Sequence, residues 1–255
     1  MYTKLNIQKF FILCLIQLSV FGLKAQVAEL QAAANAYSKS DFAQATEIYE
    51  NLLRTYGESA EVYYNLGNSY YKMNQIAPAI LNYERVLLLN PGDKDTRFNL
   101  EIAKLQTVDK IEAIEPFFLT EWLQSLQNIY GTDTWSKISI ASFILLISSL
   151  ILFFFSRKIV LKKLGFYTGI VWLIFTIAAN SFAYSQKQKL ITRNTAIVFA
   201  PTVTIKSSPD NSGNDLFILH EGTKVSIKSK LGDWSEIQIA DGNVGWIKNS
   251  DIEVI

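Results

Sequence analysis

Two stretches of this chain repeat each other at a fixed offset of 34 residues. Small residues recur at two of the matched positions, and aromatic or aliphatic residues recur at the other three. The matched pairs are Ala33 with Gly67, Tyr37 with Tyr71, Ala45 with Ala79, Tyr49 with Tyr83, and Leu52 with Val86. A period of this length is typical of stacked helix pairs, each of which buries its apolar face against the next. The repeat therefore predicts a helical array that presents a surface and carries no chemistry of its own.

The ends of the repeat helices can be read from cap and turn residues. In the second copy, residues 63–71 place small and apolar side chains three or four positions apart, on one helix face. Pro78 fits the first turn of the next helix, where a missing N–H costs little. In the first copy, Asp41 is expected to cap the second helix and Gly57 to end it. These features resemble the tetratricopeptide repeat family over residues 26–106, which implies a protein-binding domain.

A third copy begins but stops after one helix. Arg97, Leu100 and Glu101 fall at offset positions, and two of these three residues are polar. The helix at 95–106 is therefore expected to be a terminal cap that keeps the stack soluble. On the inner helix of the second copy, three polar side chains are candidates for contacting a partner protein. They are Asn65, Asn68 and Lys72.

Two long uncharged runs follow the repeats, Ile138–Phe155 and Gly165–Tyr184. The first has 18 residues, which span about 27 Å as a helix and approach the hydrocarbon thickness of a bilayer. The loop at 156–164 holds four basic and no acidic side chains, so it is expected to stay in the cytoplasm. The runs then form a transmembrane hairpin, with core helices of a soluble protein as the alternative. Gly165 and Gly169 form a G-x-x-x-G pair, which at a helix end is better read as a chance match than as a dimer contact.

The N-terminus resembles an export signal. Two lysines precede an apolar stretch at 10–23, and Ala25 follows at a plausible cleavage point. Residues 1–25 are therefore predicted to be a signal peptide, and an uncleaved anchor is the alternative. The single cysteine, Cys14, lies in this segment and is not a convincing lipidation site. Either way the repeats are exported, so both soluble domains are expected on the periplasmic side of a bacterial inner membrane.

The connector at 107–137 is rich in aromatic and aliphatic residues at near-helical spacing. A short amphipathic helix on the membrane surface would explain this pattern. Packing against the last repeat helix would explain it equally well. The residues concerned are Phe117, Phe118, Trp122, Leu123, Leu126, Ile129 and Tyr130.

The C-terminal segment has an all-β pattern. Short alternating apolar runs lie between turn signals, of which Asp241-Gly242 is typical of a hairpin. About five short strands in some 60 residues predict a small barrel. Residues 185–255 are assigned to a linker followed by a domain that resembles the bacterial SH3-like (SH3b) family, which implies a binding module that sometimes contacts cell-wall peptides. The resemblance rests on Thr204–Pro209, Glu221–Val225, Gly232–Ile237, Asp241-Gly242 and Gly245–Ile247.

The tryptophans and the histidine of this segment are the residues that could have a functional role. Trp234 is the candidate ligand contact of the SH3-like domain, and the alternative is that Trp234 and Trp246 only fill a small core. The only histidine, His220, falls at a predicted strand end, where a solvated side chain is expected. No spacing of residues suggests a metal site, a phosphate-binding loop or a nucleophile with its base. We therefore expect no catalytic residues, no cofactor and no enzymatic activity.

Charge limits the class of partner. Residues 26–115 carry 13 acidic and 8 basic side chains, and residues 196–255 carry 8 acidic and 5 basic ones. Acidic domains argue against nucleic acid as a partner. A small basic cluster, Lys187, Lys189 and Arg193, follows the second apolar run on the side expected to be exported.

The order of these parts resembles the BatE proteins of the Bacteroides aerotolerance (Bat) group. That resemblance implies von Willebrand factor A-type membrane proteins as partners, a link to a MoxR-type ATPase, and a role in stress tolerance or envelope integrity. The expected fold is multidomain α and β: helical repeats, a two-helix transmembrane hairpin and a small SH3-like β-barrel. The expected function is a non-catalytic inner-membrane adapter. The alternative is a cell-wall sensor or hydrolase accessory that binds peptidoglycan through the SH3-like domain.

Overall fold

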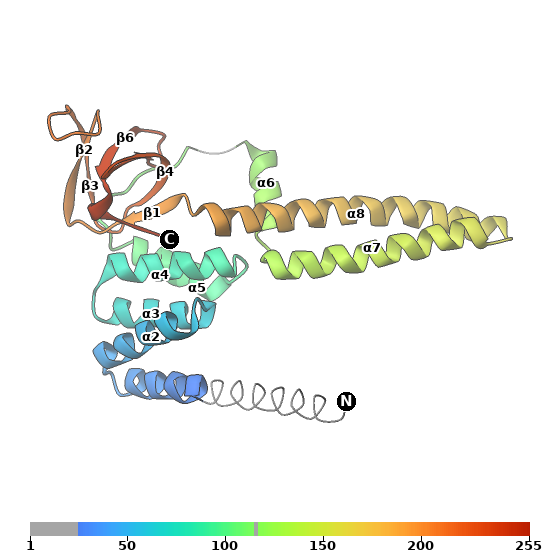
Figure 1. Cartoon of the computed structure of the whole chain (residues 1–255), viewed down its shortest axis with the longest axis horizontal. Coiled ribbons are helices and arrows are strands. Elements are labelled where there is room, and N and C mark those ends of the chain that lie inside the picture. The colour runs from blue at the N-terminus through green and yellow to red at the C-terminus, as the bar shows by residue number, and fades with distance from the viewer. Residues whose placement is uncertain (1–24, 115–116) are drawn as a thin grey trace, which may run out of the picture.

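The computed structural model describes residues 25–114 and 117–255. The predicted signal peptide lies outside the described residues except for Ala25, which is helical. The helical repeats and the β-sheet module sit together at one end of the molecule, and a long pair of antiparallel helices projects away from them (Figure 1). Both soluble modules therefore lie at the same end of the helical hairpin.

The described part of the repeat domain forms five helices. Consecutive helices pack against each other, so the stack grows in sequence order. The first helix includes residues 25–38, and it is followed by α2 (Phe42–Tyr56), α3 (Ala60–Lys72), α4 (Ile76–Leu89) and α5 (Lys94–Lys104).

Residues related by the 34-residue offset occupy equivalent places in the two copies. Tyr49 and Tyr83 are both fully buried, as are the small residues Ala45 and Ala79. A Cβ on Gly67 would lie 2.8 Å from the ring of Tyr83, so only glycine lets α3 approach α4 this closely. The tetratricopeptide-like packing inferred from the period is thereby confirmed.

The predicted helix ends are also confirmed. The Asp41 side chain accepts a hydrogen bond of 3.1 Å from the Gln44 backbone N–H and caps α2. Gly57 ends the same helix with φ of 87°, a conformation that glycine adopts without strain. Pro78 is the third residue of α4, where its missing N–H has no helical partner.

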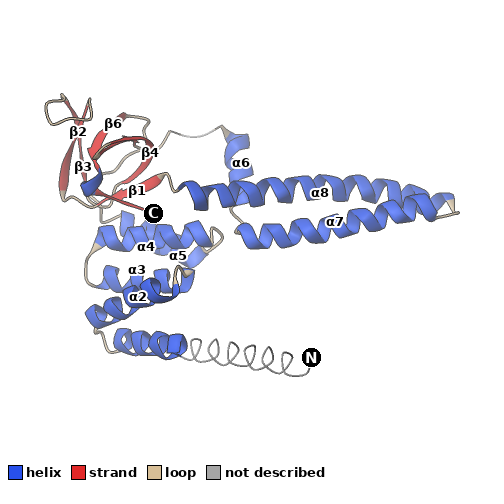
Figure 2. Ribbon diagram, in the orientation of Figure 1, coloured by secondary structure: helices blue, strands red, loops and turns tan. Residues whose placement is uncertain are grey.

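The C-terminal module is one antiparallel sheet of seven strands in the order β3-β2-β6-β5-β4-β1-β7. Figure 2 shows its strands in red, gathered above the repeat helices. The edge strands β3 and β7 do not pair with each other, so the sheet is not closed. The expected small all-β module of short strands is confirmed, but its sheet has seven strands and is not closed into a barrel, because an alternating pattern does not reveal the shortest strands or decide which strands pair. The strands are β1 (Thr195–Val198), β2 (Thr202–Lys206), β3 (Asp215–His220), β4 (Lys224–Leu231), β5 (Trp234–Gln238), β6 (Val244–Lys248) and β7 (Ile252–Val254).

The sheet module covers the end of the repeat stack. Ile80 of α4 and Leu100 of α5 share a buried cluster with Ile197 of β1 and with Ile255. The exposed side of α5 is mixed, since it carries Arg97 together with Phe98, which is 66% exposed, so the polar outer face expected of a cap is found only in part. The repeats and the sheet are therefore joined by a common apolar core, which the sequence did not reveal.

The first part of the predicted connector belongs to the sheet module. Ile111 packs against the core of the sheet, and the Ile114 N–H donates a hydrogen bond of 3.1 Å to the Ala240 carbonyl. We call residues 107–114 the strap. It ties the end of α5 to the sheet.

Helix α6 (Phe118–Gln127) has no buried residue, so it is not held by packing on the last repeat helix. It crosses α8 where the hairpin meets the soluble modules (Figure 1), and Gln127 Nε2 donates a hydrogen bond of 2.9 Å to Ser185 Oγ. Its large apolar side chains, including Phe118 and Trp122, are exposed. An amphipathic helix at a membrane surface stays a prediction for this part of the connector.

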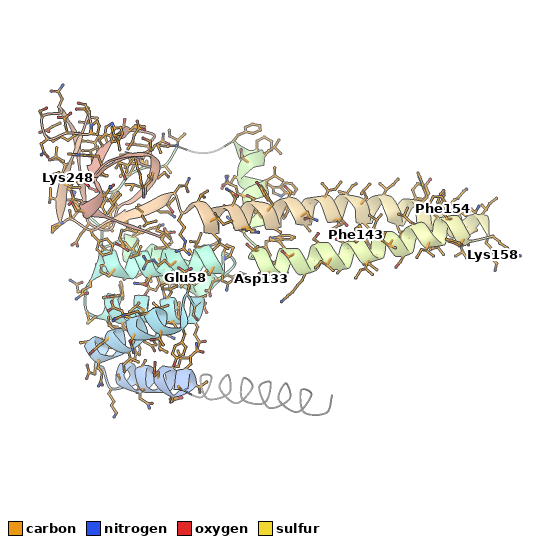
Figure 3. All side chains as sticks on the ribbon, viewed as in Figure 1. Glu58, Asp133, Phe143, Phe154, Lys158 and Lys248 are labelled. Carbon is orange, nitrogen blue, oxygen red and sulfur yellow. The ribbon has the colours of Figure 1, made fainter. Side chains whose placement is uncertain are left out.

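The hairpin consists of α7 (Thr132–Phe155) and α8 (Ile159–Thr192), both long and apolar enough to cross a membrane. Only Ser156–Lys158 separate them, so the loop expected at 156–164 is much shorter. The segment Ile159–Leu164 contains no glycine or proline that would break a helix, and α8 takes it in as its first turns. Lys158 marks the far tip in Figure 3, whereas Asp133 lies at the end next to the soluble modules.

Small and hydroxyl residues hold the two long helices together. A Cβ on Gly165 would lie 2.8 Å from both the Ser149 carbonyl oxygen and the Phe153 backbone nitrogen. The G-x-x-x-G pair is therefore a packing contact within the hairpin, not a chance match. Thr176 Oγ1 also donates a hydrogen bond of 3.1 Å to Ser142 Oγ across the interface. Such close contacts and interhelical hydrogen bonds are the usual basis of helix association in membranes.

Candidate functional site

The inner surface of the repeats contains a cavity of about 380 Å³. The helix at 25–38, α3 and α5 supply most of its lining, which matches the concave side of a repeat stack, and α4 supplies its floor. The lining residues are Tyr37, Asn68, Tyr71, Lys72, Tyr83, Asn99 and Ile102. We call this cavity the repeat groove.

The floor of the repeat groove is a fixed polar network. The amide oxygen of Asn68 accepts hydrogen bonds from the Tyr83 hydroxyl at 2.8 Å and from Asn99 Nδ2 at 3.1 Å. The pKa of Tyr83 is raised well above its ordinary value, mainly by burial and to a smaller extent by Tyr64 and other nearby tyrosines. Its hydroxyl therefore keeps its proton and stays a donor. The network occupies the oxygen of Asn68 and leaves its NH₂ group for a ligand.

Two of the three residues proposed from the sequence line the repeat groove. Lys72 is exposed at its rim and has no carboxylate within salt-bridge distance in the described ranges. Asn65 does not line the groove. It sits one turn earlier on α3, where its backbone carbonyl accepts a hydrogen bond of 2.9 Å from Ser69 Oγ.

Sequence reasoning missed two groove residues on α5, although the repeat offset points to both. Asn99 lies 34 residues after Asn65, and Ile102 lies 34 residues after Asn68. Extending the period into the third copy would have found them. The groove offers aromatic faces, amide donors and one ammonium group, which suit the backbone and a polar or acidic side chain of an extended peptide.

A second candidate surface is the outer face of the sheet. On β5 and β6, Trp234 pairs with Lys248, and Glu236 pairs with Trp246. Both tryptophans are half-buried and neither belongs to the buried core cluster, so the reading in which they only fill the core was wrong. The Lys248 ammonium lies 5.6 Å from the centre of the Trp234 ring, at cation–π distance. Trp234 as a ligand contact stays a prediction, but its ring is accessible.

The prediction that His220 is a solvated strand residue is wrong. Its ring Nδ1 lies 2.8 Å from Asp109 Oδ1, and its backbone N–H donates a hydrogen bond of 2.7 Å to Asp109 Oδ2. Thr223 Oγ1 donates a further hydrogen bond of 2.7 Å to the same oxygen. Partial burial would raise the pKa of Asp109, but these hydrogen bonds outweigh it and hold the pKa below its usual value. The histidine therefore fastens the strap to the sheet.

Charged side chains reinforce the joint between the repeats and the rest of the molecule. Arg85 on α4 donates a hydrogen bond of 2.9 Å to the Val254 carbonyl and pairs with Glu253 at 3.2 Å. Lys224 Nζ lies 2.6 Å from the Glu84 carboxylate. Glu84 is buried, and Lys104 Nζ also lies 3.8 Å from its carboxylate, so two lysines balance this buried charge at the joint.

Comparisons with known proteins agree with the two soluble modules. Residues 60–93, which are α3 and α4 with the following turn, match the tetratricopeptide repeat model. Residues 201–253, which are strands β2–β6 and most of β7, match the bacterial SH3 domain model. A comparison with curated proteins finds no match for this chain. The chain therefore carries a tetratricopeptide repeat and a bacterial SH3 domain on either side of a long apolar helical hairpin.

Proposed function

We propose that this protein is a non-catalytic adapter of a bacterial inner membrane, which presents a tetratricopeptide groove and an SH3 module in the periplasm. One observation carries the proposal: two binding modules are docked on each other at one end of a hairpin long enough to cross a bilayer. A chain that crosses twice returns to its starting side, so the two modules share one compartment. Their common core supports this directly, since modules on opposite faces could not touch.

The charge of the hairpin tip supports the orientation. Arg157, Lys158, Lys162 and Lys163 gather at the turn between α7 and α8 and the first turns of α8, with no acidic residue among them. Short basic segments beside apolar spans remain in the cytoplasm. The modules at the other end then face the periplasm, in agreement with the export signal expected at the N-terminus.

The repeat groove is small, so one peptide segment bound there would have modest affinity. A partner anchored in the same membrane would gain from the high effective concentration that a shared anchor provides. The resemblance to the Bat group supports von Willebrand factor A-type membrane proteins as that partner, in a complex for stress tolerance or envelope integrity.

Crosslinking in cells followed by purification of the membrane complex tests the adapter function. We expect a membrane-protein partner to be recovered, with crosslinks to the lining of the repeat groove. Recovery of this chain alone, at a crosslinker dose that captures a known complex of the same membrane, would contradict the proposal.

Binding of peptidoglycan through the sheet is a second candidate, favoured by the accessible Trp234 and Trp246 on one outer face. The full-length protein should be used with purified sacculi, because the strap completes the core of the sheet. Retention that is lost in Trp234→Ala, but kept in Ile218→Ala on the exposed edge strand β3, would establish this function. Equal retention of both variants, or none with the wild type, would exclude it.

A further inference from the structure

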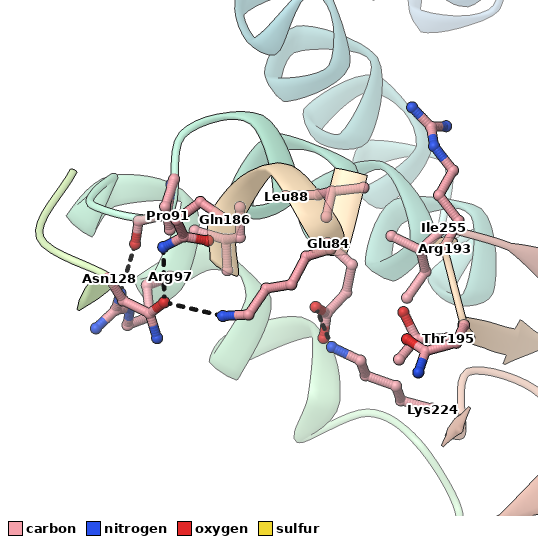
Figure 4. Close-up of a pocket in the computed structure, with 13 residues that line it drawn as sticks. Glu84, Leu88, Pro91, Arg97, Asn128, Gln186, Arg193, Thr195, Lys224 and Ile255 are labelled. Carbon is pink, nitrogen blue, oxygen red and sulfur yellow. Dashed lines mark hydrogen bonds and ion pairs between the residues drawn. The ribbon is translucent and has the colours of Figure 1, made fainter. Parts of the chain in front are cut away.

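A cavity of about 460 Å³ lies where α8 leaves the hairpin and meets α4 and strands β1 and β4 (Figure 4). Its lining combines two kinds of surface. Leu87, Leu88 and Ile255 supply apolar side chains, and basic and amide groups supply the rest. We call it the junction cavity. It is separate from the repeat groove and from the outer face of the sheet.

The charged side chains of the junction cavity are unbalanced. Arg97, Lys189, Arg193 and Lys224 are basic, and Glu84 is the one acidic side chain in the lining. Lys224 is paired with Glu84 at 2.6 Å, and Arg193 is paired with Glu58 outside the cavity. Arg97 and Lys189 have no carboxylate within 4.0 Å among residues 25–114 and 117–255. Two positive charges are therefore available to a ligand.

Neutral oxygens hold these two cations in place without using up their donors. Arg97 Nη2 donates a hydrogen bond of 2.7 Å to the Pro91 carbonyl, and Lys189 Nζ donates one of 3.3 Å to Asn128 Oδ1. The same Asn128 oxygen accepts a hydrogen bond of 3.1 Å from Gln186. A guanidinium has five donors and an ammonium has three, so most of them remain for an anion.

The position of the cavity along α8, just beyond the apolar part of the hairpin, indicates where the anion comes from. Lys189 lies five residues beyond Tyr184, where the second apolar run ends, which is about 7.5 Å along a helix. The polar headgroup layer occupies roughly 5–8 Å on each side of the hydrocarbon core. Helix α6 lies at the same junction (Figure 1), and it carries the exposed Trp122, a residue type that often anchors helices at a membrane interface.

We propose that the junction cavity binds the phosphate of an anionic phospholipid. Arg97 and Lys189 donate to the phosphate oxygens, and the half-buried Leu87 and Leu88 contact the apolar part of the lipid next to it. The inference rests on the proposed membrane mounting of the hairpin. A free phosphate ion would satisfy the same two cations, so the experiment must separate the two sources.

Full-length protein reconstituted in phosphatidylcholine nanodiscs, with or without phosphatidylglycerol, provides the test. Native mass spectrometry then measures which lipid stays bound after release from the disc. We expect phosphatidylglycerol to be enriched on the wild type. The double variant Arg97→Gln/Lys189→Gln should lose this preference by about 25-fold, since each cation near a membrane surface contributes about a fivefold preference. Lys187→Gln, on the same helix but outside the cavity, should keep it.

Two other outcomes of this experiment would overturn the inference. An equal loss in Lys187→Gln would overturn the inference in favour of general surface charge. The second outcome is that inorganic phosphate is the species that stays bound to the wild type in phosphatidylcholine discs. If it is retained there and phosphatidylglycerol is not enriched, the assignment to a lipid is overturned. Flotation with vesicles after an alkaline wash checks the mounting separately. A protein that floats but shows no lipid preference refutes this inference alone, whereas one that does not float refutes the proposed membrane function.

Discussion

The guanidinium of Arg193, at the end of α8, donates two parallel hydrogen bonds to the carboxylate of Glu58, just before α3. The bond from Nη1 to Oε1 measures 2.8 Å. This pair joins the last turn of the hairpin to the repeats across 135 residues of sequence. It sets the repeats in a fixed position relative to the long helices, together with the contacts of α4 and β1.

Removing this pair should loosen the joint without unfolding the modules. Because both side chains are about one-third exposed, we expect Glu58→Gln to cost only about 1 kcal/mol. Hydrogen exchange of the purified protein should show faster exchange at the start of α3 and the end of α8. Glu47→Gln, an exposed carboxylate of α2 with no salt bridge in the described ranges, is the matched control. Unchanged exchange in Glu58→Gln would mean that the pair contributes nothing to the joint.

The Glu58 pair should also give way in acid. Its hydrogen bond with Arg193 is the main reason that the pKa of Glu58 lies below its usual value, although partial burial opposes the shift. A carboxylate with a lowered pKa in the folded state stabilises the fold above its unfolded pKa. This contribution is lost as the pH falls through the lower, folded value. The difference in stability between wild type and Glu58→Gln should therefore be full at pH 7, begin to fall as the pH drops through about 4, and disappear only below the folded pKa of Glu58. A difference that grows in acid would contradict this account.

Asp109 should be the residue that holds the strap. Asp109→Ala leaves the Thr223 hydroxyl and the His220 N–H without their acceptor, at a cost of about 1–3 kcal/mol. Thermal unfolding and hydrogen exchange of residues 107–114 measure the effect. Glu112→Ala, an exposed carboxylate of the same strap, should change neither quantity. Equal effects from the two substitutions would show that the Asp109 contacts are not specific.

The two glycines of the hairpin should respond differently to a methyl group. Gly165→Ala places a Cβ 2.8 Å from backbone atoms of α7 and should cost about 1–3 kcal/mol, whereas the nearest atom to a Cβ at Gly169 is 3.7 Å away. Disulfide formation between cysteines placed at Ser142 and Thr176 reports the helix contact. It should slow in Gly165→Ala and stay normal in Gly169→Ala. Equal rates in both variants would contradict the observed packing.

Charge reversal in the repeat groove should weaken partner binding selectively. Lys72 is the one ammonium group in the groove lining, so Lys72→Glu should reduce crosslinked partner at least severalfold. Arg54→Glu makes the same charge change on the exposed face of α2 and should have no effect. A smaller amount of crosslinked partner in both variants would indicate that the overall charge of the domain, and not the groove, governs partner binding.

The parts of the fold that could be predicted are those encoded by local patterns. The 34-residue offset places Tyr49 and Tyr83 in equivalent buried positions, and uncharged runs mark the hairpin. Such patterns record which face of an element is buried, and they do not record which distant element covers it. The apolar contact between Ile80 and Ile197 and the pairing of Asp109 with His220 join segments more than 100 residues apart, so no periodicity could show them.

The candidate groove was only partly predictable for a related reason. Asn68 and Lys72 were found because the second copy has a clear helical face. Asn99 was overlooked because α5 was read only as a cap, although the same offset leads to it from Asn65. A capping helix can still contribute its inner face to the groove, since only its outer face must meet water.

The central claim is that the repeats and the sheet share one compartment while the hairpin tip lies in the other. The most direct test labels single cysteines, in a Cys14→Ser background, with a membrane-impermeant maleimide on intact spheroplasts. The variants are Arg54→Cys in the repeats, Asp241→Cys in the sheet and Lys158→Cys at the tip. We expect the first two to be labelled at once and the third only after the membrane is permeabilised. Labelling of Arg54→Cys and Asp241→Cys on opposite sides of the membrane would contradict the account.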